Sequence, residues 1–181
     1  MMIKTTLFSL VLFICAFSLN AQNLSQNISK TTVNFKIKNL GLNVDGHFSD
    51  IKIESNFNIN ALNDSYLNAT IKVSSIDTGN KTRNKSLSEK DYFDSNTYPE
   101  IQLKSTSIKK KTESTYLLTA QLTIKNTTKT VTIPLQLSEN GSSVTLTSYF
   151  ELNRRDYNVG KKSWVMSDIV KINVVYIATR S

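Results

Sequence analysis

The residue best suited to acid–base chemistry is the single histidine, His47. It lies between Gly46 and Phe48 in a strand-like segment, where an outward-facing or pocket-lining imidazole is the simpler interpretation. Composition alone leaves open a Ser-His-Asp arrangement. A zinc site would need three or four clustered histidine, cysteine or acidic ligands, and no such cluster is visible. We therefore predict that the protein is not an enzyme and holds no metal or cofactor.

A second group of charged residues surrounds Arg83, with Asp77, Asp91 and Asp94 close to it in the sequence. These acids could tune a ligand head group or act as paired carboxylates. The favoured alternative is structural. In it, Asp77 caps a short helix or turn over residues 80–88, and Arg83 pairs with a neighbouring acid.

Two adjacent arginines, Arg154 and Arg155, offer a third possibility. Guanidinium groups bind phosphate oxygens bidentately, so this pair could receive a pyrophosphate. Alternatively, at least one of them braces a hairpin against Asp156. Tyr157 and Trp164 follow in a loop-rich stretch, where they either line the mouth of a cavity or plug the end of a barrel.

The elements that must position these groups are strands, because apolar and polar residues alternate along almost the whole chain. A strand places successive side chains on opposite faces, so each segment has one apolar face. The apolar series are Val33–Ile37, Ile51–Ile59, Leu67–Val73, Ile101–Leu103, Tyr116–Ile124, Val131–Leu137, Val144–Leu152 and Val170–Tyr176. Residues 79–95 lack this pattern and are predicted to form a short helix with a loop.

About eight antiparallel strands with one apolar face each can bury those faces as a sandwich or as a closed barrel. A barrel of this size can hold one small ligand. Periodicity alone does not choose between these folds. Pro134 interrupts an otherwise regular strand, which predicts a sheet edge or a position whose N–H the ladder does not need.

The first 21 residues have the layout of a secretory signal peptide. Lys4 precedes an apolar stretch over residues 7–19, which is shorter than a membrane span, and a cut after Ala21 would leave residues 22–181 as one domain. The only cysteine, Cys15, would be removed, so no disulfide is expected. The formal net charge of +8 is spread along the chain without interleaved aromatics. This distribution argues against nucleic-acid binding and leaves a peripheral contact with an anionic membrane surface as an expectation.

Several motifs in a fixed order resemble the YceI-like family. They are Ser75-Ile76-Asp77-Thr78-Gly79-Asn80, Arg83, Leu87, Asp91-Tyr92-Phe93-Asp94, Tyr98-Pro99-Glu100-Ile101, Val44-Asp45-Gly46-His47-Phe48, Leu122-Thr123-Ile124 with Thr128-Lys129-Thr130-Val131, and Leu152-Asn153-Arg154-Arg155-Asp156-Tyr157. Together they cover nearly all of residues 32–178. Members of this family are lipid-binding, lipocalin-like barrels of the bacterial periplasm.

The resemblance implies a single all-β, antiparallel lipocalin-like barrel of about eight strands with one short inserted helix. It also implies a secreted or periplasmic protein that carries a long isoprenoid-type lipid, such as a quinone or a polyprenyl phosphate, and that could form a homodimer. The alternative is a structural or stress-related module with a packed barrel that acts through protein contacts. The predicted cavity wall is Phe35, Ile37, Phe48, Phe57, Ile71, Ile101, Leu103, Leu118, Leu122, Ile133, Leu146 and Phe150, and the predicted mouth is Arg83, Arg154, Tyr157 and Trp164.

Overall fold

The computed structural model describes residues 23–180, which form eleven strands, one α-helix and three short 3-10 helices. The strands are β1 (Leu24–Gln26), β2 (Thr32–Asn39), β3 (Leu42–Phe48), β4 (Ile51–Ser55), β5 (Leu67–Lys72), β6 (Ile76–Asp77), β7 (Glu100–Lys110), β8 (Thr115–Ile124), β9 (Thr127–Asn140), β10 (Ser143–Asn153) and β11 (Met166–Arg180). The helices are α1 (Lys81–Ser88), η1 (Leu62–Asp64), η2 (Val73–Ser75) and η3 (Arg154–Tyr157).

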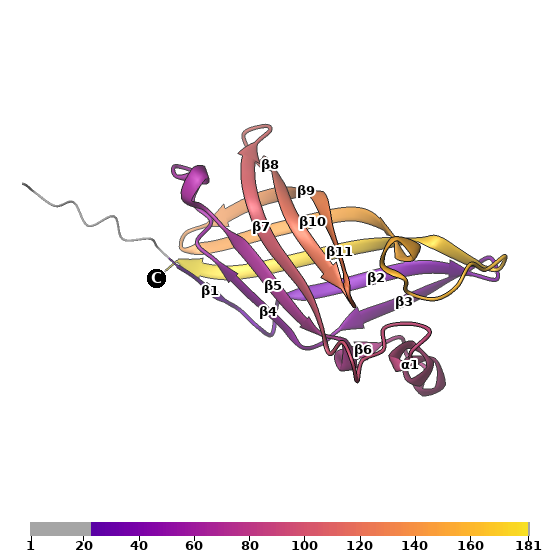
Figure 1. The fold of residues 1–181 in the computed structure, drawn as a ribbon. Coiled ribbons are helices and arrows are strands. Elements are labelled where there is room, and N and C mark those ends of the chain that lie inside the picture. Colours follow the sequence, from indigo (N-terminus) through magenta and orange to yellow (C-terminus); the bar gives the residue numbers. More distant parts are fainter. Residues whose placement is uncertain (1–22, 181) are drawn as a thin grey trace, which may run out of the picture.

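All neighbouring strands pair antiparallel, and the sheet closes on itself (Figure 1). The closed ring runs β1-β4-β5-β7-β8-β9-β10-β11 and returns to β1, which gives eight strands. Strand β11 is long enough to pair with β1 through its last residues and with β2 through its first part. From there β2, β3 and β6 extend the wall at one end. The predicted closed barrel with one short inserted helix is confirmed.

The closing seam between β1 and β4 has a single main-chain pair, Leu24 with Ser55. The side-chain amide of Gln26 continues this seam. Its oxygen accepts a hydrogen bond from the Ile53 N–H at 2.7 Å, and its nitrogen donates to the Ile51 carbonyl at 3.0 Å. A side-chain amide offers the same donor and acceptor as a peptide group, so Gln26 takes the place of a missing strand residue.

Burial of the inward-facing side chains changes along the barrel. On β11, Val170, Ile172 and Val174 are only half-buried, whereas Tyr176 and Ala178 are buried. All five share one parity and therefore one face. The barrel is thus packed where β11 meets β1 and is less filled toward the β2–β3 hairpin.

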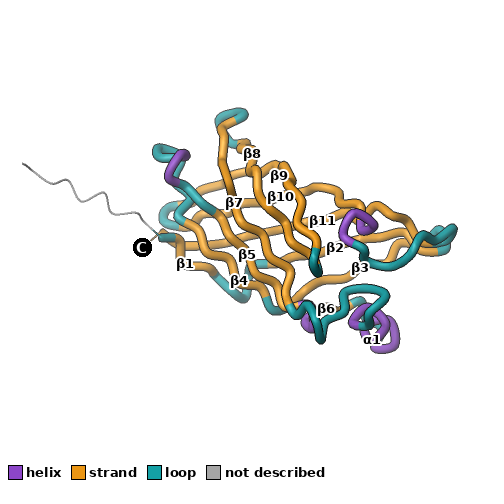
Figure 2. Tube along the Cα trace, in the orientation of Figure 1, coloured by secondary structure: helices purple, strands orange, loops and turns teal. Residues whose placement is uncertain are grey.

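Strand β10 has the same gradient, from buried Val144 and Leu146 to half-buried Phe150 and Leu152. Figure 2 shows the strands as a continuous wall, with α1 beside its far end next to β6. The interior of the barrel is therefore packed at one end and less filled at the other. We call the less filled end the open end.

Aromatic packing closes the filled end. The rings of Phe57 and Tyr116 meet edge to face with 5.1 Å between centroids, and both side chains are 1% exposed. Phe57 lies beyond β4, because the strand predicted over Ile51–Ile59 ends at Ser55. The Ser55 hydroxyl accepts from the Phe57 N–H and donates to the Tyr66 carbonyl. These side-chain bonds replace the ladder and lead the chain into η1.

Pro134 lies inside β9, opposite Leu117 of β8. The ladder between β9 and β10 ends at the pair formed by Gln136 and Thr147. Beyond it, the Ser148 hydroxyl donates to the Pro134 carbonyl at 2.6 Å. In an antiparallel strand the N and C=O of one residue point the same way, so the missing N–H faces a side with no ladder partner. This confirms the prediction for Pro134.

The gradient predicts unequal costs for truncating two phenylalanines. Phe57→Ala at the packed end should lower the free energy of unfolding by about 3–5 kcal/mol, because a filled site cannot collapse around the void. Phe150→Ala should cost clearly less, because this half-buried ring faces space that is already open. Guanidinium unfolding of both variants measures the difference. Equal losses would contradict an interior that is packed at one end only.

Candidate functional site, an apolar cavity inside the barrel

The less filled part of the barrel contains a cavity of about 340 Å³. This volume lies in the range of small-molecule sites, which is roughly 300–1,000 Å³. Every strand except β1 contributes to its wall, as do α1 and η3. Most of the side chains are aliphatic or aromatic. The cavity can therefore hold an apolar group by removing its surface from water.

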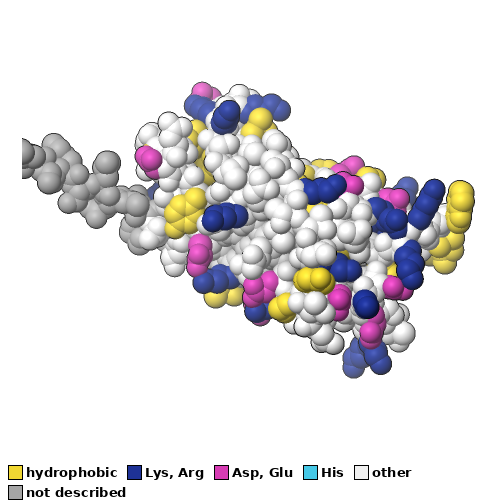
Figure 3. Space-filling model, viewed as in Figure 1, with side chains coloured by type: hydrophobic (Ala, Val, Ile, Leu, Met, Phe, Trp, Pro, Cys, Tyr) yellow, Lys and Arg dark blue, Asp and Glu magenta, His cyan; other side chains and the backbone are white. Residues whose placement is uncertain are grey.

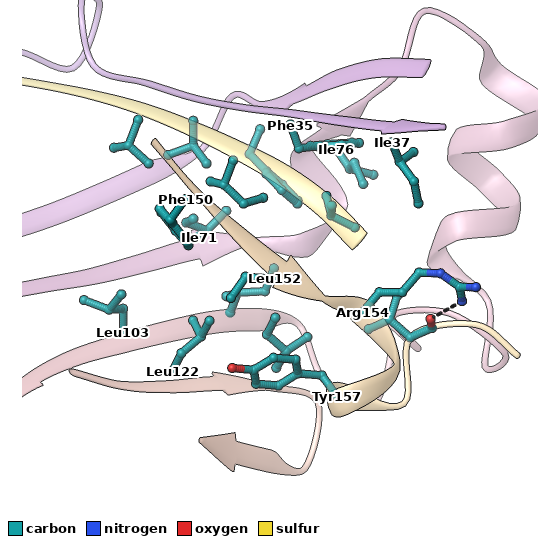
Figure 4. A pocket seen from close by; sticks show the side chains of 18 of the residues that line it. Phe35, Ile37, Ile71, Ile76, Leu103, Leu122, Phe150, Leu152, Arg154 and Tyr157 are labelled. Atoms are coloured by element: carbon teal, nitrogen blue, oxygen red, sulfur yellow. Dashed lines mark hydrogen bonds between the residues drawn. The ribbon is translucent and has the colours of Figure 1, made fainter. Parts of the chain in front are cut away.

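Eleven of the twelve predicted wall residues lie on this wall. They are Phe35, Ile37, Phe48, Ile71, Ile101, Leu103, Leu118, Leu122, Ile133, Leu146 and Phe150. Figure 4 shows several of them converging from different strands. The exception is Phe57, which packs against Tyr116 in the filled end instead. That the eleven contact a lipid stays a prediction.

Strand β11 supplies wall residues that the sequence prediction missed. Val170, Ile172 and Val174 all line the cavity, together with Leu87 and Phe93 from the helical segment. The period of two had placed the β11 residues on the apolar face, so that signal could have identified them. The helical segment has no period-two pattern, and only its place in the fold brings Leu87 and Phe93 to the cavity.

A glycine on β3 makes room for one wall residue. Gly46 pairs with Phe35 across the β2–β3 ladder. A Cβ atom at Gly46 would lie 2.3 Å from the tip of the Phe35 ring. Such an overlap is not tolerated, so glycine at this position lets the ring lie flat over the neighbouring strand.

At the mouth, a hydrogen-bonded turn holds Arg83. The Asn80 side chain, and not Asp77 as predicted, caps α1 by accepting from the Arg83 N–H at 2.9 Å. The Arg83 guanidinium donates to the Thr78 hydroxyl and carbonyl, at 2.9 and 2.7 Å, instead of pairing with an acid as predicted. Among residues 23–180, Arg83 forms no ion pair. Its charge is therefore not neutralised at the cavity edge.

Asp77 stabilises the same turn from the other side. Its carboxylate accepts from the Asn84 amide at 2.9 Å and from the Gly79 N–H at 2.8 Å. These two hydrogen bonds lower the pKa of Asp77 below its ordinary value. Asp77 therefore serves the fold of the mouth, and neither Asp91 nor Asp94 pairs with it in a carboxylate dyad.

Arg154 lies on the wall but is already engaged by the protein. Its guanidinium donates to the carbonyls of Ser167, Val159 and Lys161, and it forms an ion pair with Asp168 at 2.7 Å. Burial lowers the pKa of Arg154, and Asp168 opposes this effect. The group stays charged. Arg154 thus braces the loop after η3, which leaves little for a ligand phosphate.

The predicted partner of the two arginines was wrong. Asp156 pairs with Lys129 of β9 at 3.4 Å, and Arg155 donates to the Gly160 carbonyl at 3.1 Å. Arg154 instead forms its ion pair with Asp168 of β11. The bracing interpretation therefore holds for Arg154, although through a different acid.

Of the two predicted aromatic mouth residues, Tyr157 lines the cavity and is 2% exposed. Burial raises its pKa above the ordinary value. Trp164 neither lines the cavity nor plugs the barrel, because its side chain is 96% exposed. Its ring is covered only by the Lys162 ammonium, 5.6 Å from the centroid.

His47 is exposed on β3, opposite Asp77 of β6, and is not part of the cavity wall. The Asp77 carboxylate beside it is held by Gly79 and Asn84. No group of three metal-ligating side chains occurs among residues 23–180. Within the same residues, no helix is both long and apolar enough to cross a membrane. The predicted signal peptide lies outside the described residues.

A closed antiparallel barrel with an apolar interior cavity defines a lipocalin-like, ligand-binding class of protein. Within that class, residues 25–178 match the family described as the YceI-like domain. The chain belongs to this family.

Comparisons with individual proteins agree with the family. A UPF0312 protein of Photorhabdus laumondii is 34% identical over 146 residues, which span 77% of this chain and 76% of that protein. The chain in the crystal structure of Burkholderia cenocepacia BcnA is 29% identical and has a TM-score of 0.82, and the match covers 86% of this chain and 100% of that chain. A polyisoprenoid binding domain from Saccharophagus degradans has a TM-score of 0.71 at 13% identity, covering 87% and 98% of the two chains. The last similarity shows the fold alone.

The environment of Arg154 predicts a large difference between two adjacent arginines. Arg154→Ala should lower the free energy of unfolding by about 3–5 kcal/mol, because Asp168 loses its partner and three carbonyls lose their donor. Arg155→Ala, the matched control, removes the side-chain hydrogen bond to the Gly160 carbonyl and should cost about 0.5–1.5 kcal/mol. Chemical unfolding checks both values, and similar losses would contradict a bracing role for Arg154 alone.

Tyr176 predicts a dependence on alkaline pH. Its hydroxyl is buried without a hydrogen-bond partner among the described residues, and burial raises its pKa to about 12. Because the unfolded chain ionises this group near pH 10, ionisation favours unfolding, and stability falls as the pH rises from about 10 to 12. The free energy of unfolding of the Tyr176→Phe variant, measured by circular dichroism, should therefore fall less steeply than that of the wild type between about pH 10 and pH 12. The same pH dependence of stability in both proteins would contradict the raised pKa of Tyr176.

Proposed function

We propose that this protein binds one long apolar lipid of the isoprenoid type and carries or sequesters it without chemical change. The single observation that carries the proposal is the apolar cavity of about 340 Å³ inside the barrel, lined by the strands together with α1 and η3. A packed structural module would have no use for such a hollow. Membership of the YceI-like family and the similarity in fold to the polyisoprenoid binding domain from Saccharophagus degradans support the same class of ligand.

Burial of a prenyl chain supplies enough free energy for binding. Each buried methylene contributes about 0.8 kcal/mol, so roughly twenty buried carbons contribute about 16 kcal/mol. Association and ordering cost about 4–15 kcal/mol. A partly enclosed chain therefore binds without a covalent step, and neither a nucleophile nor a general base is required.

The head group is expected at the mouth beside α1. Ser86 is exposed and also lines the cavity, which puts an opening next to this helix. Arg83 lies one helical turn earlier, and its charge has no acidic partner among residues 23–180. A guanidinium at this place suits a phosphate, whereas a quinone would need only a hydrogen-bond donor. Both head groups remain candidates, and Arg83 is the residue that distinguishes them.

The expected location follows from the first 21 residues, whose composition is that of a secretory signal peptide. We propose that the mature protein works in the periplasm or outside the cell. Lipids with long prenyl chains do not dissolve in that aqueous space, so a protein that encloses the chain makes their transfer between membranes feasible.

The test is to purify the mature protein, extract it with organic solvent and identify co-purified lipid by mass spectrometry. Binding of added ubiquinone and undecaprenyl phosphate is measured in parallel. Leu103→Trp should abolish or strongly reduce binding, because its indole would occupy the cavity. Lys104→Trp is the matched control, since its neighbouring side chain is exposed on the outer face of β7. This control should bind as the wild type does.

The same assay separates the head groups. If a phosphate is the natural head group, Arg83→Gln should weaken the binding of undecaprenyl phosphate about tenfold or more. The binding of ubiquinone should stay nearly unchanged. Recovery of no lipid, together with no binding of either probe, would contradict the proposed function.

A further inference from the structure

Four large apolar side chains are exposed together at the open end of the barrel. Leu40 lies in the turn of the β2–β3 hairpin and Leu42 follows it, and they are 71% and 73% exposed. Trp164 and Val165 come from the loop before β11. The Leu40 N–H donates to the Val165 carbonyl at 2.7 Å, which joins the two segments. Figure 3 shows the corresponding cluster of hydrophobic side chains at the tip, beside Lys and Arg side chains. We call Leu40, Leu42, Trp164 and Val165 the apolar tip.

The backbone of this turn is unfavourable for the residue it contains. Leu40 has φ of 52° and Gly41 has φ of 77°, so both occupy the left-handed region. A two-residue hairpin turn of this type strongly favours asparagine followed by glycine. Leucine is disfavoured there by its Cβ, and it also exposes an apolar side chain to water. Neither feature helps folding, and such an outlier points to a role in binding.

The two segments that form the tip are basic. Residues 36–45 and 158–165 contain Lys36, Lys38, Lys161 and Lys162 but only one acid, Asp45. Asp45 is paired with Lys36 at 3.2 Å, and Lys161 is paired with Asp91 at 3.1 Å. Lys38 and Lys162 form no ion pair among residues 23–180. Apolar side chains at the end of a protein with lysines behind them are typical of surfaces that enter the interface of an anionic bilayer, where tryptophan is also enriched.

The apolar tip is continuous with the cavity. Asn39 and Met166 pair with each other across β2 and β11, and both line the cavity. Asn39 precedes Leu40, and Met166 follows Val165. A partner that binds the apolar tip therefore lies next to the end of the cavity wall.

We propose that the apolar tip docks this protein on an anionic lipid bilayer, with the open end of the barrel facing the membrane. The proposal concerns a docking surface and does not depend on which ligand the cavity takes. A second copy of the chain fits the surface less well. A two-fold contact places the same patch against itself and would bring the two sets of lysines together. An anionic membrane pairs Lys38 and Lys162 while it buries the apolar side chains.

The chain contains its own probe, because Trp164 is the only tryptophan. Vesicles of phosphatidylcholine with a quarter phosphatidylglycerol should shift Trp164 emission to shorter wavelength and pellet the protein on centrifugation. Pure phosphatidylcholine vesicles should bind it much more weakly. Salt at about 1 M, which reduces the Debye length to ~3 Å, should release a large share of the bound protein.

The test variant is Leu40→Asn with Leu42→Thr, which keeps the tryptophan. Asparagine suits the left-handed turn and threonine suits a strand, so thermal stability should be equal or higher. Vesicle binding should fall about tenfold or more. Ile28→Asn is the matched control, because Ile28 is also exposed but lies near β1, away from the tip. This variant should bind vesicles as the wild type does.

Three results would overturn the proposal. One is the absence of vesicle binding by the wild type. Another is equal binding by the Leu40→Asn, Leu42→Thr variant. The third is a wild-type dimer in sedimentation velocity that this variant disperses, which would assign the tip to a second copy of the chain. Lipid extraction and quinone binding are scored separately, so failure of docking and failure of ligand binding are distinguishable.

Discussion

The closed ladder of main-chain hydrogen bonds is the interaction on which this structure depends. A globular protein ordinarily supports its strands with a close-packed interior, and voids in that interior are costly. Here β11 is paired along both edges, to β10 on one side and to β1 and β2 on the other. Because the wall satisfies its own backbone groups, it does not need a filled centre. The Gln26 amide matters for the same reason, since it closes the seam where main-chain pairing is shortest.

The barrel separates stability from binding along its axis. The filled end concentrates buried side chains such as Phe57, Tyr116 and Val144, which supply most of the apolar packing. The other end presents apolar side chains to a hollow, and its mouth is held by polar contacts around Arg83 and Arg154. A site made from half-buried residues gives up packing free energy. The filled end and the closed ladder offset that loss, so the hollow end can be shaped for a ligand.

Sequence periodicity predicted the strands and their inward faces well, because a period of two follows directly from strand geometry. It could not predict which inward residues face a void. Phe57 and Phe150 are the same residue type with apolar neighbours at the same spacing, yet one packs in the core and the other lines the cavity. The difference depends on their height in the barrel. That height is set by the stagger of all the strands and leaves no local trace in the sequence.

Charged residues were harder to predict for a related reason. Nearness in sequence suggested Asp156 as the partner of the arginines beside it, but the fold brings Asp168 to Arg154 and Lys129 to Asp156. The family motif located the mouth better than nearness of charges in the sequence did. Its residues from Asp77 to Arg83 form one hydrogen-bonded unit there.

The position of the apolar tip agrees with this division of the barrel. A strained leucine and an exposed tryptophan would be a liability in the filled end, where each unfavourable contact lowers stability directly. At the tip they lie beyond the last cavity-lining pair, Asn39 and Met166, where the protein generates little of its stability. An apolar chain that leaves a membrane loses least free energy when no water separates the bilayer from the cavity. Under the proposed function, the surface that touches the membrane should therefore adjoin the cavity, and these four side chains do so next to Asn39 and Met166 of the cavity wall.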